Sequence, residues 1–271
     1  MIDLYVFPPS PRAFKVMVIA NHLGLETKVR FVDLIRGDQK APEYATLNPN
    51  MRMPTLQDGD YVLWESNAIA QYLAGMKPGS GLLPQDERAR LDVTRWQFWD
   101  LAHWDPACAV FLFENVAKSV VFKRGEPDPA ALAKGAESFE RAAKVLDGEL
   151  KGRKFIIGEE LTVADFCLGA PLNYAEMARL PIEPYREYQT LVRKLASIAG
   201  LAEDACAMRA SCRGRGLMRG ERRAGSASWS GSTLSHGFNN RGSTRNETLH
   251  LSAIVTSARR RGPEESPCPR L

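Results

Sequence analysis

The first 34 residues constrain the fold of this chain more than any other segment. The apolar segment IDLYVF, residues 2–7, predicts a buried strand, and KVRFVDL, residues 28–34, predicts a second one. Between them, Ser10 and Pro11 are typical of a helix N-cap and its first residue, and Gly24 is typical of a helix end. A strand, a helix and a strand in this order form a right-handed unit with parallel strands.

A hairpin and a second helix are predicted after this unit. PTLQ and YVLW lie on either side of Asp58-Gly59, which is a strong signal for a two-residue hairpin loop. ESNAIAQYLA, residues 65–74, then carries its apolar residues on one helical face. A parallel strand pair followed by a hairpin and a helix is the order of a thioredoxin-like domain, which we predict over residues 1–76.

The rest of the first 200 residues is predicted to be helical. The Gly and Pro content of residues 77–86 indicates a linker. Residues 87–200 then repeat apolar positions three and four apart, and Pro106 is expected to kink the first helix. Thr162 and Asp165 have the spacing of a capping box. The fold class is therefore an α/β thioredoxin-like N-terminal domain joined to an all-α C-terminal domain.

Composition changes abruptly after residue 200. Residues 201–271 contain 12 arginines, no lysine and 6 acidic residues, whereas residues 1–200 contain 24 basic and 26 acidic residues. The tail is dominated by Arg, Gly and Ser without a periodic pattern, which predicts disorder. We favour a shift of reading frame near residue 202 as its origin, and an Arg-Gly nucleic-acid-binding arm is the alternative.

Neither a metal centre nor a disulfide framework is indicated. The five cysteines are scattered without a CxxC pair, and only His22 and His103 lie in the first 200 residues. No apolar stretch approaches the roughly 20 residues of a membrane span, and the first residues lack the pattern of a signal peptide. We therefore expect a cytoplasmic protein that binds no metal, membrane or nucleic acid.

The segment from Met53 to Ser66 has the features of a ligand site. A cis bond between Met53 and Pro54 would turn the backbone groups of Met53 towards an extended, peptide-like ligand. Helix N–H groups and the Ser66 hydroxyl suit a ligand carboxylate, and Glu65 suits a ligand ammonium. The alternatives are an ordinary trans proline and a Ser66 that only caps the helix.

Three further polar residues flank this segment in the predicted fold. Ser10 begins the first helix, where a hydroxyl donor and the helix dipole would stabilise a thiolate over a thiol. Lys40 and Arg52 lie in loops on the same face and would hold a second carboxylate. A plain helix cap and two solvated charges are the alternatives. An amino-acid head, a thiol and a terminal carboxylate together describe glutathione.

Four separated motifs resemble the soluble glutathione S-transferases over roughly residues 1–200. PPSPRAFKV places Ser10 at the thiol-activating position, and LNPNMRMPTL places Pro54 at the family's cis-proline. LWESNAIAQYLA resembles the segment whose Glu-Ser pair binds the γ-glutamyl group, and LTVADF resembles a capped helix of the second domain. The resemblance is to serine-type members, plant phi-like and related bacterial ones. Met51 is a departure, because many members have glycine there.

The resemblance implies how glutathione is held and used. Gln39 and Lys40 would bind its glycyl carboxylate, while Arg52 and Met53 would pair with its peptide backbone. Its thiolate, stabilised by Ser10, would attack a small, largely apolar electrophile without any cofactor. The family also implies a homodimer, formed by the first domain of one subunit and the second domain of the other.

The resemblance further implies an electrophile pocket between the domains. It would lie against the helix that carries Trp99, His103 and Trp104, although we expect at least one of these tryptophans in the core. A cysteine-type thioltransferase is disfavoured, since it requires a cysteine at the position of Ser10. A non-catalytic glutathione- or partner-binding module on the same fold remains the alternative.

Overall fold

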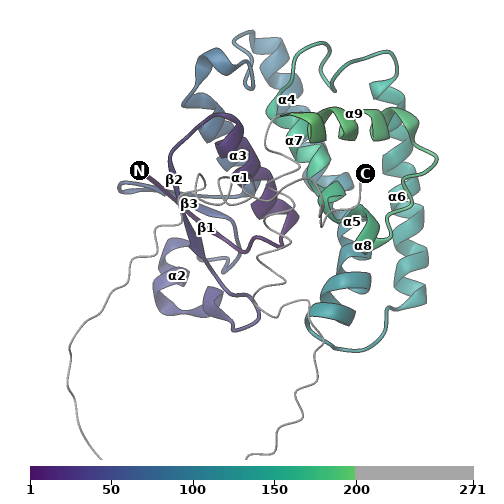
Figure 1. Ribbon diagram of the computed structural model, residues 1–271, viewed down its shortest axis with the longest axis horizontal. Helices are drawn as coiled ribbons and strands as arrows, with labels where there is room; N and C mark the ends of the chain where they lie inside the picture. Colours follow the sequence, from purple (N-terminus) through teal and green to yellow (C-terminus); the bar gives the residue numbers. More distant parts are fainter. Residues whose placement is uncertain (199–271) are drawn as a thin grey trace, which may run out of the picture.

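The computed structural model describes residues 1–198, and the first 75 of them contain a four-stranded mixed sheet (Figure 1). The strand order is β2-β1-β3-β4. β1 and β2 are parallel, β3 is antiparallel to β1, and β4 is antiparallel to β3. The predicted strand–helix–strand unit and hairpin are therefore confirmed. The strands are β1 (Ile2–Val6), β2 (Thr27–Phe31), β3 (Thr55–Asp58) and β4 (Tyr61–Trp64).

The hairpin loop lies one residue later than predicted. Asp58 pairs with Tyr61 across the two strands, so the loop consists of Gly59 and Asp60 instead of Asp58 and Gly59. Gly59 has a φ of +63°, in the left-handed region that glycine adopts without steric cost. The turn signal was correct, but the strand extends one residue into it.

Helices cover both faces of the sheet. The long helices α1 (Pro11–His22) and α3 (Ser66–Gly75) pack on one face, where Leu4 and Val6 of β1 are fully buried. On the other face, Tyr44 packs with Phe7, Val32 and Met53 in a smaller apolar cluster. Tyr44 belongs to α2 (Pro42–Leu47), which follows η1 (Asp38–Lys40). These two short helices were not predicted, because neither is long enough to show a periodic pattern.

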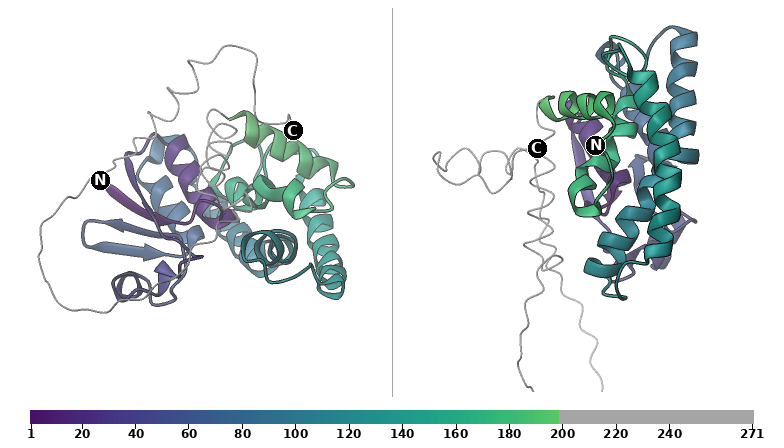
Figure 2. Two further views of the ribbon diagram at one scale, coloured as in Figure 1. Left: turned by 60° about the horizontal axis from the view of Figure 1, so that its bottom comes forward. Right: turned by 90° about the vertical axis from the view of Figure 1, so that its right-hand side faces the viewer.

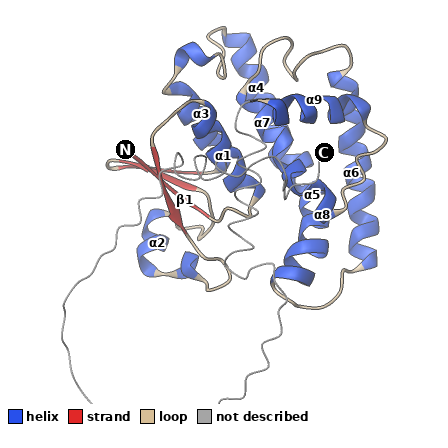
Figure 3. Ribbon diagram, in the orientation of Figure 1, coloured by secondary structure: helices blue, strands red, loops and turns tan. Residues whose placement is uncertain are grey.

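The second half of the described chain contains helices and no strand of the sheet, as Figure 3 shows. The left view of Figure 2 shows that these helices stand beside the sheet. The helices are η2 (Pro78–Ser80), α4 (Glu87–Trp99), η3 (Asp100–Trp104), α5 (Asp105–Leu112), η4 (Phe113–Val121), α6 (Pro129–Leu150), α7 (Val163–Gly169), η5 (Ala170–Tyr174), α8 (Ala175–Ala178) and α9 (Arg186–Ser197).

The first long helix of this half changes type instead of ending. Segments η3 and η4 are π-helical, and the N–H of Asp105 donates to the carbonyl of Asp100, five residues back. Pro106, expected to kink the helix, lies in the first turn of α5, directly after this π turn. In an α-helix, residues five apart lie about 140° from one another around the axis. The i→i+5 bond of a π turn brings them to the same side.

The predicted capping box at the start of α7 is confirmed. The Asp165 carboxylate accepts hydrogen bonds from the N–H of Thr162 at 2.9 Å, from its hydroxyl at 3.0 Å and from the N–H of Ile156 at 2.8 Å. Burial raises the pKa of Asp165 to about 6, against the opposing effect of these hydrogen bonds. The box fixes α7, which packs against α1 and α3 of the first half and α4 and α9 of the second.

Two further sets of expectations concern the tail of the chain and membrane-spanning helices. The predictions of disorder, of a frame shift and of a nucleic-acid-binding arm fall on residues 201–271, which lie outside the described residues. Within the described part, no helix is both long enough and apolar enough to cross a membrane.

Candidate functional site

The sheet register brings three predicted site segments to one edge. Tyr5 pairs with Thr55, and Thr55 also pairs with Trp64 on its other side. Pro54 directly precedes Thr55, Glu65 directly follows Trp64, and Ser10 comes five residues after Tyr5, beyond the end of β1. Segments far apart in the chain therefore meet at the same end of neighbouring strands.

Ser10 occupies the N-cap position of α1 with an extended backbone, and Pro11 is the first helical residue, as predicted. The N–H of Ser10 donates to the carbonyl of Phe7 at 2.8 Å, which fixes the turn before the helix. The Ser10 hydroxyl makes no capping hydrogen bond to the helix. The plain-cap alternative therefore lacks the hydrogen bond on which it depends, and the hydroxyl remains available to a ligand.

The Met53-Pro54 peptide bond is cis, as predicted. Two residues earlier, Met51 has a φ of +52°, a left-handed conformation that is uncommon for any residue other than glycine. The turn for which many family members use glycine is therefore retained with a methionine.

A polar cluster that the sequence analysis missed fixes the backbone before the cis bond. The carbonyl of Arg52 accepts from the Tyr44 hydroxyl at 2.6 Å and from Nδ2 of Asn48 at 2.8 Å. Asn48 also donates to Oγ1 of Thr55 at 3.0 Å, and Asn48 and Thr55 are buried. The Asn-Pro dipeptide at 48–49 was the available signal. The Arg52 side chain itself is exposed, and its backbone is the part held in place.

The Glu65-Ser66 pair has an unusual geometry. Glu65, not Ser66, occupies the N-cap position of α3, with a φ of +74°, whereas Ser66 is the first residue of the helix. The Ser66 side chain is almost fully buried, and its Oγ has no hydrogen-bond partner among the described residues. An unsatisfied buried hydroxyl costs about 1–3 kcal/mol. The simple capping role considered for Ser66 is therefore not observed. Its hydroxyl lacks a hydrogen-bond partner of the kind that a bound ligand would supply.

Gln39 and Lys40 both lie in η1, on the α2 side of the sheet. Lys40 is exposed, so its charge is accessible. Gln39 is half-buried, and its Oε1 is a second buried polar atom without a partner in the described part of the chain.

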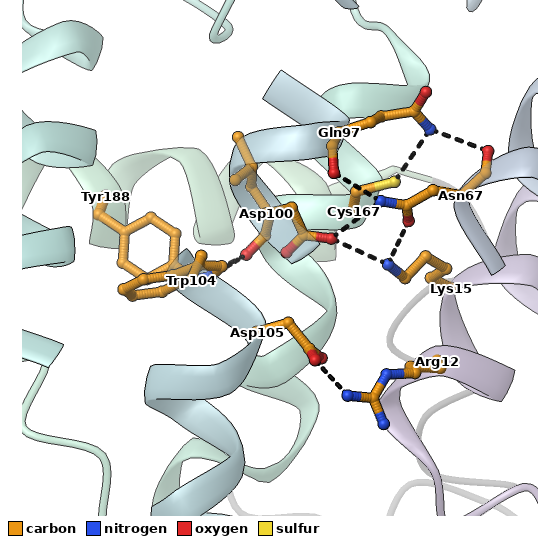
Figure 4. A network of polar contacts seen from close by, with 10 residues as sticks. Arg12, Lys15, Asn67, Gln97, Asp100, Trp104, Asp105, Cys167 and Tyr188 are labelled. Atoms are coloured by element: carbon orange, nitrogen blue, oxygen red, sulfur yellow. Dashed lines mark hydrogen bonds and ion pairs between the residues drawn. The ribbon is translucent and has the colours of Figure 1, made fainter. Parts of the chain in front are cut away.

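A buried polar network between the two halves was not identified from the sequence (Figure 4). Nζ of Lys15, on α1, donates to Oδ1 of Asn67 at 2.6 Å and lies 3.1 Å from Oδ2 of Asp100. Nδ2 of Asn67 donates to the carbonyl of Gln97 at 2.9 Å, and Nε2 of Gln97 donates back to the carbonyl of Asn67 at 3.1 Å. Since Asn67 directly follows Ser66, the second half of the chain holds the helix start at which the buried hydroxyl lies.

Lys15 and Asp100 shift the pKa values of one another. Burial alone would lower the pKa of Lys15, but the Asp100 carboxylate, with smaller contributions from Cys167 and Asp105, raises it overall. Burial raises the pKa of Asp100, and the Lys15 ammonium and the hydrogen bond from Asn67 oppose that rise. The short distance between Nζ and Oδ2 fits two charges that stabilise each other away from water.

A second ion pair joins α1 to the next element of the same long helix, α5, one π turn further along. Nη2 of Arg12 donates to Oδ2 of Asp105, as Figure 4 shows. Because the π turn brings Asp100 and Asp105 to one side, both meet basic residues of α1 that are three apart. Arg12 and Asp105 also line a small cavity of about 40 Å³ between the two halves. Its other walls are Pro11, Cys108, Ala109, Leu112, Pro171, Ala178 and Leu180.

The three aromatic-stripe residues do not share this cavity. Trp99 and His103 line a larger cavity of about 640 Å³ whose walls all come from residues 99–145, so it includes no residue of the sheet half. Trp104 is fully buried, where its Nε1 donates to the Leu168 carbonyl at 2.9 Å. The burial of Trp104 agrees with the expectation that at least one of these tryptophans lies in the core, and the electrophile pocket against this helix stays a prediction. On its side facing α1, the helix presents Asp105, Cys108 and Leu112.

Two family models match the chain. The glutathione S-transferase N-terminal domain matches residues 1–75, and the glutathione S-transferase C-terminal domain matches residues 103–198. The two matched segments correspond to the sheet half and to most of the helical half.

Individual relatives agree with these matches. A glutathione S-transferase of Drosophila melanogaster is 34% identical over 178 residues, which are 65% of this chain and 75% of that protein. One of Zea mays is 34% identical over 167 residues, or 60% of this chain and 73% of that protein. A glutathione transferase from Phanerochaete chrysosporium, solved with oxidized glutathione, has a TM-score of 0.68 at 27% identity, over 76% of this chain and 97% of that one. With this fold, these matches and these relatives, the chain belongs to the glutathione S-transferase family and is a glutathione transferase.

Proposed function

We propose that this transferase binds glutathione along the sheet edge described above, with the γ-glutamyl group at the start of α3. The buried hydroxyl of Ser66, which has no hydrogen-bond partner within residues 1–198, is the observation that carries this proposal. The first turn of a helix adds unpaired N–H donors and a favourable dipole for a carboxylate. Glu65 stands next to it as the partner of the ligand ammonium. Its left-handed backbone is the kind of local strain that is concentrated at binding sites.

The other end of glutathione would lie towards η1 and the segment before β3. Gln39 and Lys40 would bind the glycyl carboxylate: Lys40 supplies an accessible charge, and the side chain of Gln39 contains an unsatisfied buried oxygen. The backbone of Arg52 and Met53, held by the cluster around Asn48, would pair with the peptide groups of the ligand, next to Pro54. The Phanerochaete relative solved with oxidized glutathione supports glutathione as the kind of ligand.

Ser10 would stabilise the thiolate, as in a serine-type transferase. Its hydroxyl makes no cap bond, and the N-terminus of α1 favours negative charge. The thiolate would attack a small electrophile that enters beside Pro11, where the cavity between the two halves has mostly apolar walls. The enzyme would form no covalent bond to either substrate, and no cofactor would be needed.

We further infer a cytoplasmic homodimer in which the sheet half of one subunit packs against the helical half of the other. Large apolar side chains are exposed on both faces that this arrangement requires: Tyr61 and Trp64 on β4, and Leu91 and Phe98 on α4. Light scattering tests it with Phe98→Glu, which is expected to give monomers. A wild-type monomer at micromolar concentration would refute it.

Titration of the full-length chain with glutathione, followed by the ultraviolet absorbance of the bound thiolate, tests the glutathione site. Ser10→Ala should leave the Kd within about threefold, because the other contacts remain, but should lower kcat by about 10- to 100-fold. Ser66→Ala should raise the Kd by about tenfold or more, since a hydrogen bond to a charged group is lost. Ser197→Ala, at an exposed serine of α9, is the matched control. Unchanged turnover in Ser10→Ala would refute the role of Ser10.

A further inference from the structure

We propose that Arg12 selects the class of electrophile: its guanidinium donates to an oxygen that becomes negatively charged as the thiolate adds. The favoured substrates are then conjugate acceptors, in which the attacked carbon is conjugated to a carbonyl group. This inference rests on the proposed function, because it takes the sulfur to lie beside Ser10.

The position of Arg12 is the first support. It is the second residue of α1 and the second after Ser10, and it lines the cavity between the halves. The other described walls of this cavity are apolar or sulfur-bearing except for Asp105, the partner of Arg12. The part of an electrophile that extends from the sulfur into the cavity therefore meets one positive charge, at the end near α1.

The size of the cavity is the second support. A space of this kind needs about 10–15 Å³ to hold one water molecule. The observed volume of about 40 Å³ admits a group of a few atoms, such as a carbonyl group, but not a whole aromatic substrate. The remainder of the electrophile would lie outside it, towards solvent.

The hydrogen-bonding capacity of Arg12 is the third support. A guanidinium carries five N–H donors in a planar fork, and the pair with Asp105 engages Nη2. The Arg12 side chain is 46% exposed, whereas Lys15, three residues along the same helix, is only 2% exposed. Asp105 holds the fork in place and neutralises its charge in the resting enzyme. Arg12 therefore offers directed donors without an unpaired charge that would capture a carboxylate of glutathione.

The chemical step follows from this geometry. The thiolate forms a bond to the β-carbon of an α,β-unsaturated ketone, and the C=C electron pair moves towards the carbonyl, leaving an enolate oxygen. A donor held at that oxygen stabilises the transition state more than the ground state. Water then protonates the α-carbon, which completes the thioether. With a benzyl halide, the charge leaves on the halide instead, and no oxyanion forms.

The test compares two electrophiles in the full-length enzyme and in Arg12→Gln. Benzylideneacetone forms an enolate, and benzyl chloride of similar size releases chloride. Arg12→Gln should lower kcat/KM by about tenfold or more with benzylideneacetone, and by less than about twofold with benzyl chloride. Arg95→Gln removes another arginine of an Arg–Asp pair, exposed on α4, and should change neither value.

The thiolate absorbance separates failure of this inference from failure of the proposed function. A wild-type enzyme without that signal would refute the proposed function itself. With the signal retained in Arg12→Gln, an equal loss for both electrophiles, or no loss for either, would overturn the role of Arg12. If Arg12→Gln does not fold, Arg12→Lys replaces it: it keeps the charge and should retain part of the preference, and complete loss of the preference would overturn the proposal.

Discussion

The two ion pairs that join α1 to the helical half differ sharply in their surroundings. In the Lys15–Asp100 pair the side chains are 2% and 1% exposed, and the surrounding amides take up further hydrogen bonds. In the Arg12–Asp105 pair they are 46% and 13% exposed. The pairs lie one turn apart on both helices, so sequence distance does not distinguish them, but contact with water does.

This difference assigns the two pairs different tasks. Charges removed from water depend on one another, and the loss of one partner leaves the other uncompensated. The Lys15–Asp100 pair therefore holds the halves together at a place that is closed to water. A partly exposed pair contributes little to stability. Arg12 can accordingly exchange hydrogen bonds with a substrate at small cost.

The largest expected effect is the loss of the buried cation. Lys15→Met leaves Asp100 buried without its partner and removes a donor to Asn67, so the free energy of unfolding should fall by about 3–5 kcal/mol. Urea denaturation followed by circular dichroism measures it. Because Asn67 follows Ser66, the affinity for glutathione should fall as well.

A double variant sharpens this result. In Lys15→Met/Asp100→Leu no charge remains buried at this place, and much of the lost stability should return. If the double variant were as unstable as the single one, packing of the lysine stem and not the charge pair would account for the loss.

The second effect concerns a buried carboxylate that has neutral donors in place of a cation. In Asp165→Asn one of the two acceptor oxygens is replaced by a donor, so hydrogen bonds from Thr162 or Ile156 are lost. The free energy of unfolding should fall by about 1–3 kcal/mol. A melting temperature equal to that of the wild type would show that the capping box contributes nothing to stability.

The same residue makes a prediction about pH. Its folded pKa of about 6 lies above the ordinary value of an aspartate, so the folded chain binds this proton more readily than the unfolded chain does. Its contribution to stability therefore grows as the pH falls from about 6 to about 4, and is lost as the pH rises through the folded pKa. The unfolding free energy of the wild type should therefore rise relative to that of Asp165→Asn as the pH falls from about 6 to about 4. Parallel curves would contradict the raised pKa.

The smallest expected effect is on the exposed pair. Arg12→Gln should change the free energy of unfolding by only about 0–1 kcal/mol, with a weaker effect at high salt. Thermal melting at low and high ionic strength measures it. A loss as large as that of Lys15→Met would abolish the contrast between the two pairs.

Local patterns in the sequence predicted most of the fold. Gly24 and Gly59 marked ends and turns at positions where the backbone is left-handed, and the Thr162–Asp165 spacing identified a real capping box. Such features are encoded within a few residues, so they can be recognised without knowing the tertiary structure. The cis Met53-Pro54 bond was found through its motif.

Long-range features could not be predicted in the same way. Lys15 in the apolar run AFKVMVIA and Asp100 in FWDLAHW are isolated charges, which hinted at buried partners, but nothing local joins residues 85 positions apart. The direction in which Trp99 and His103 face depended on the π turn, which a 3.6-residue period does not reveal. The aromatic stripe was recognised from the sequence, and the pocket assigned to it stays a prediction.

The π turn between Asp100 and Asp105 also determines which changes of length this enzyme tolerates. With one residue deleted within η3, the two acidic residues would be four apart, about 40° from one another in an α-helix, and both would still face α1. With one residue inserted, they would be six apart, about 120° from one another in an α-helix, and one of them would leave α1. This segment is therefore expected to tolerate the loss of one residue better than the gain of one.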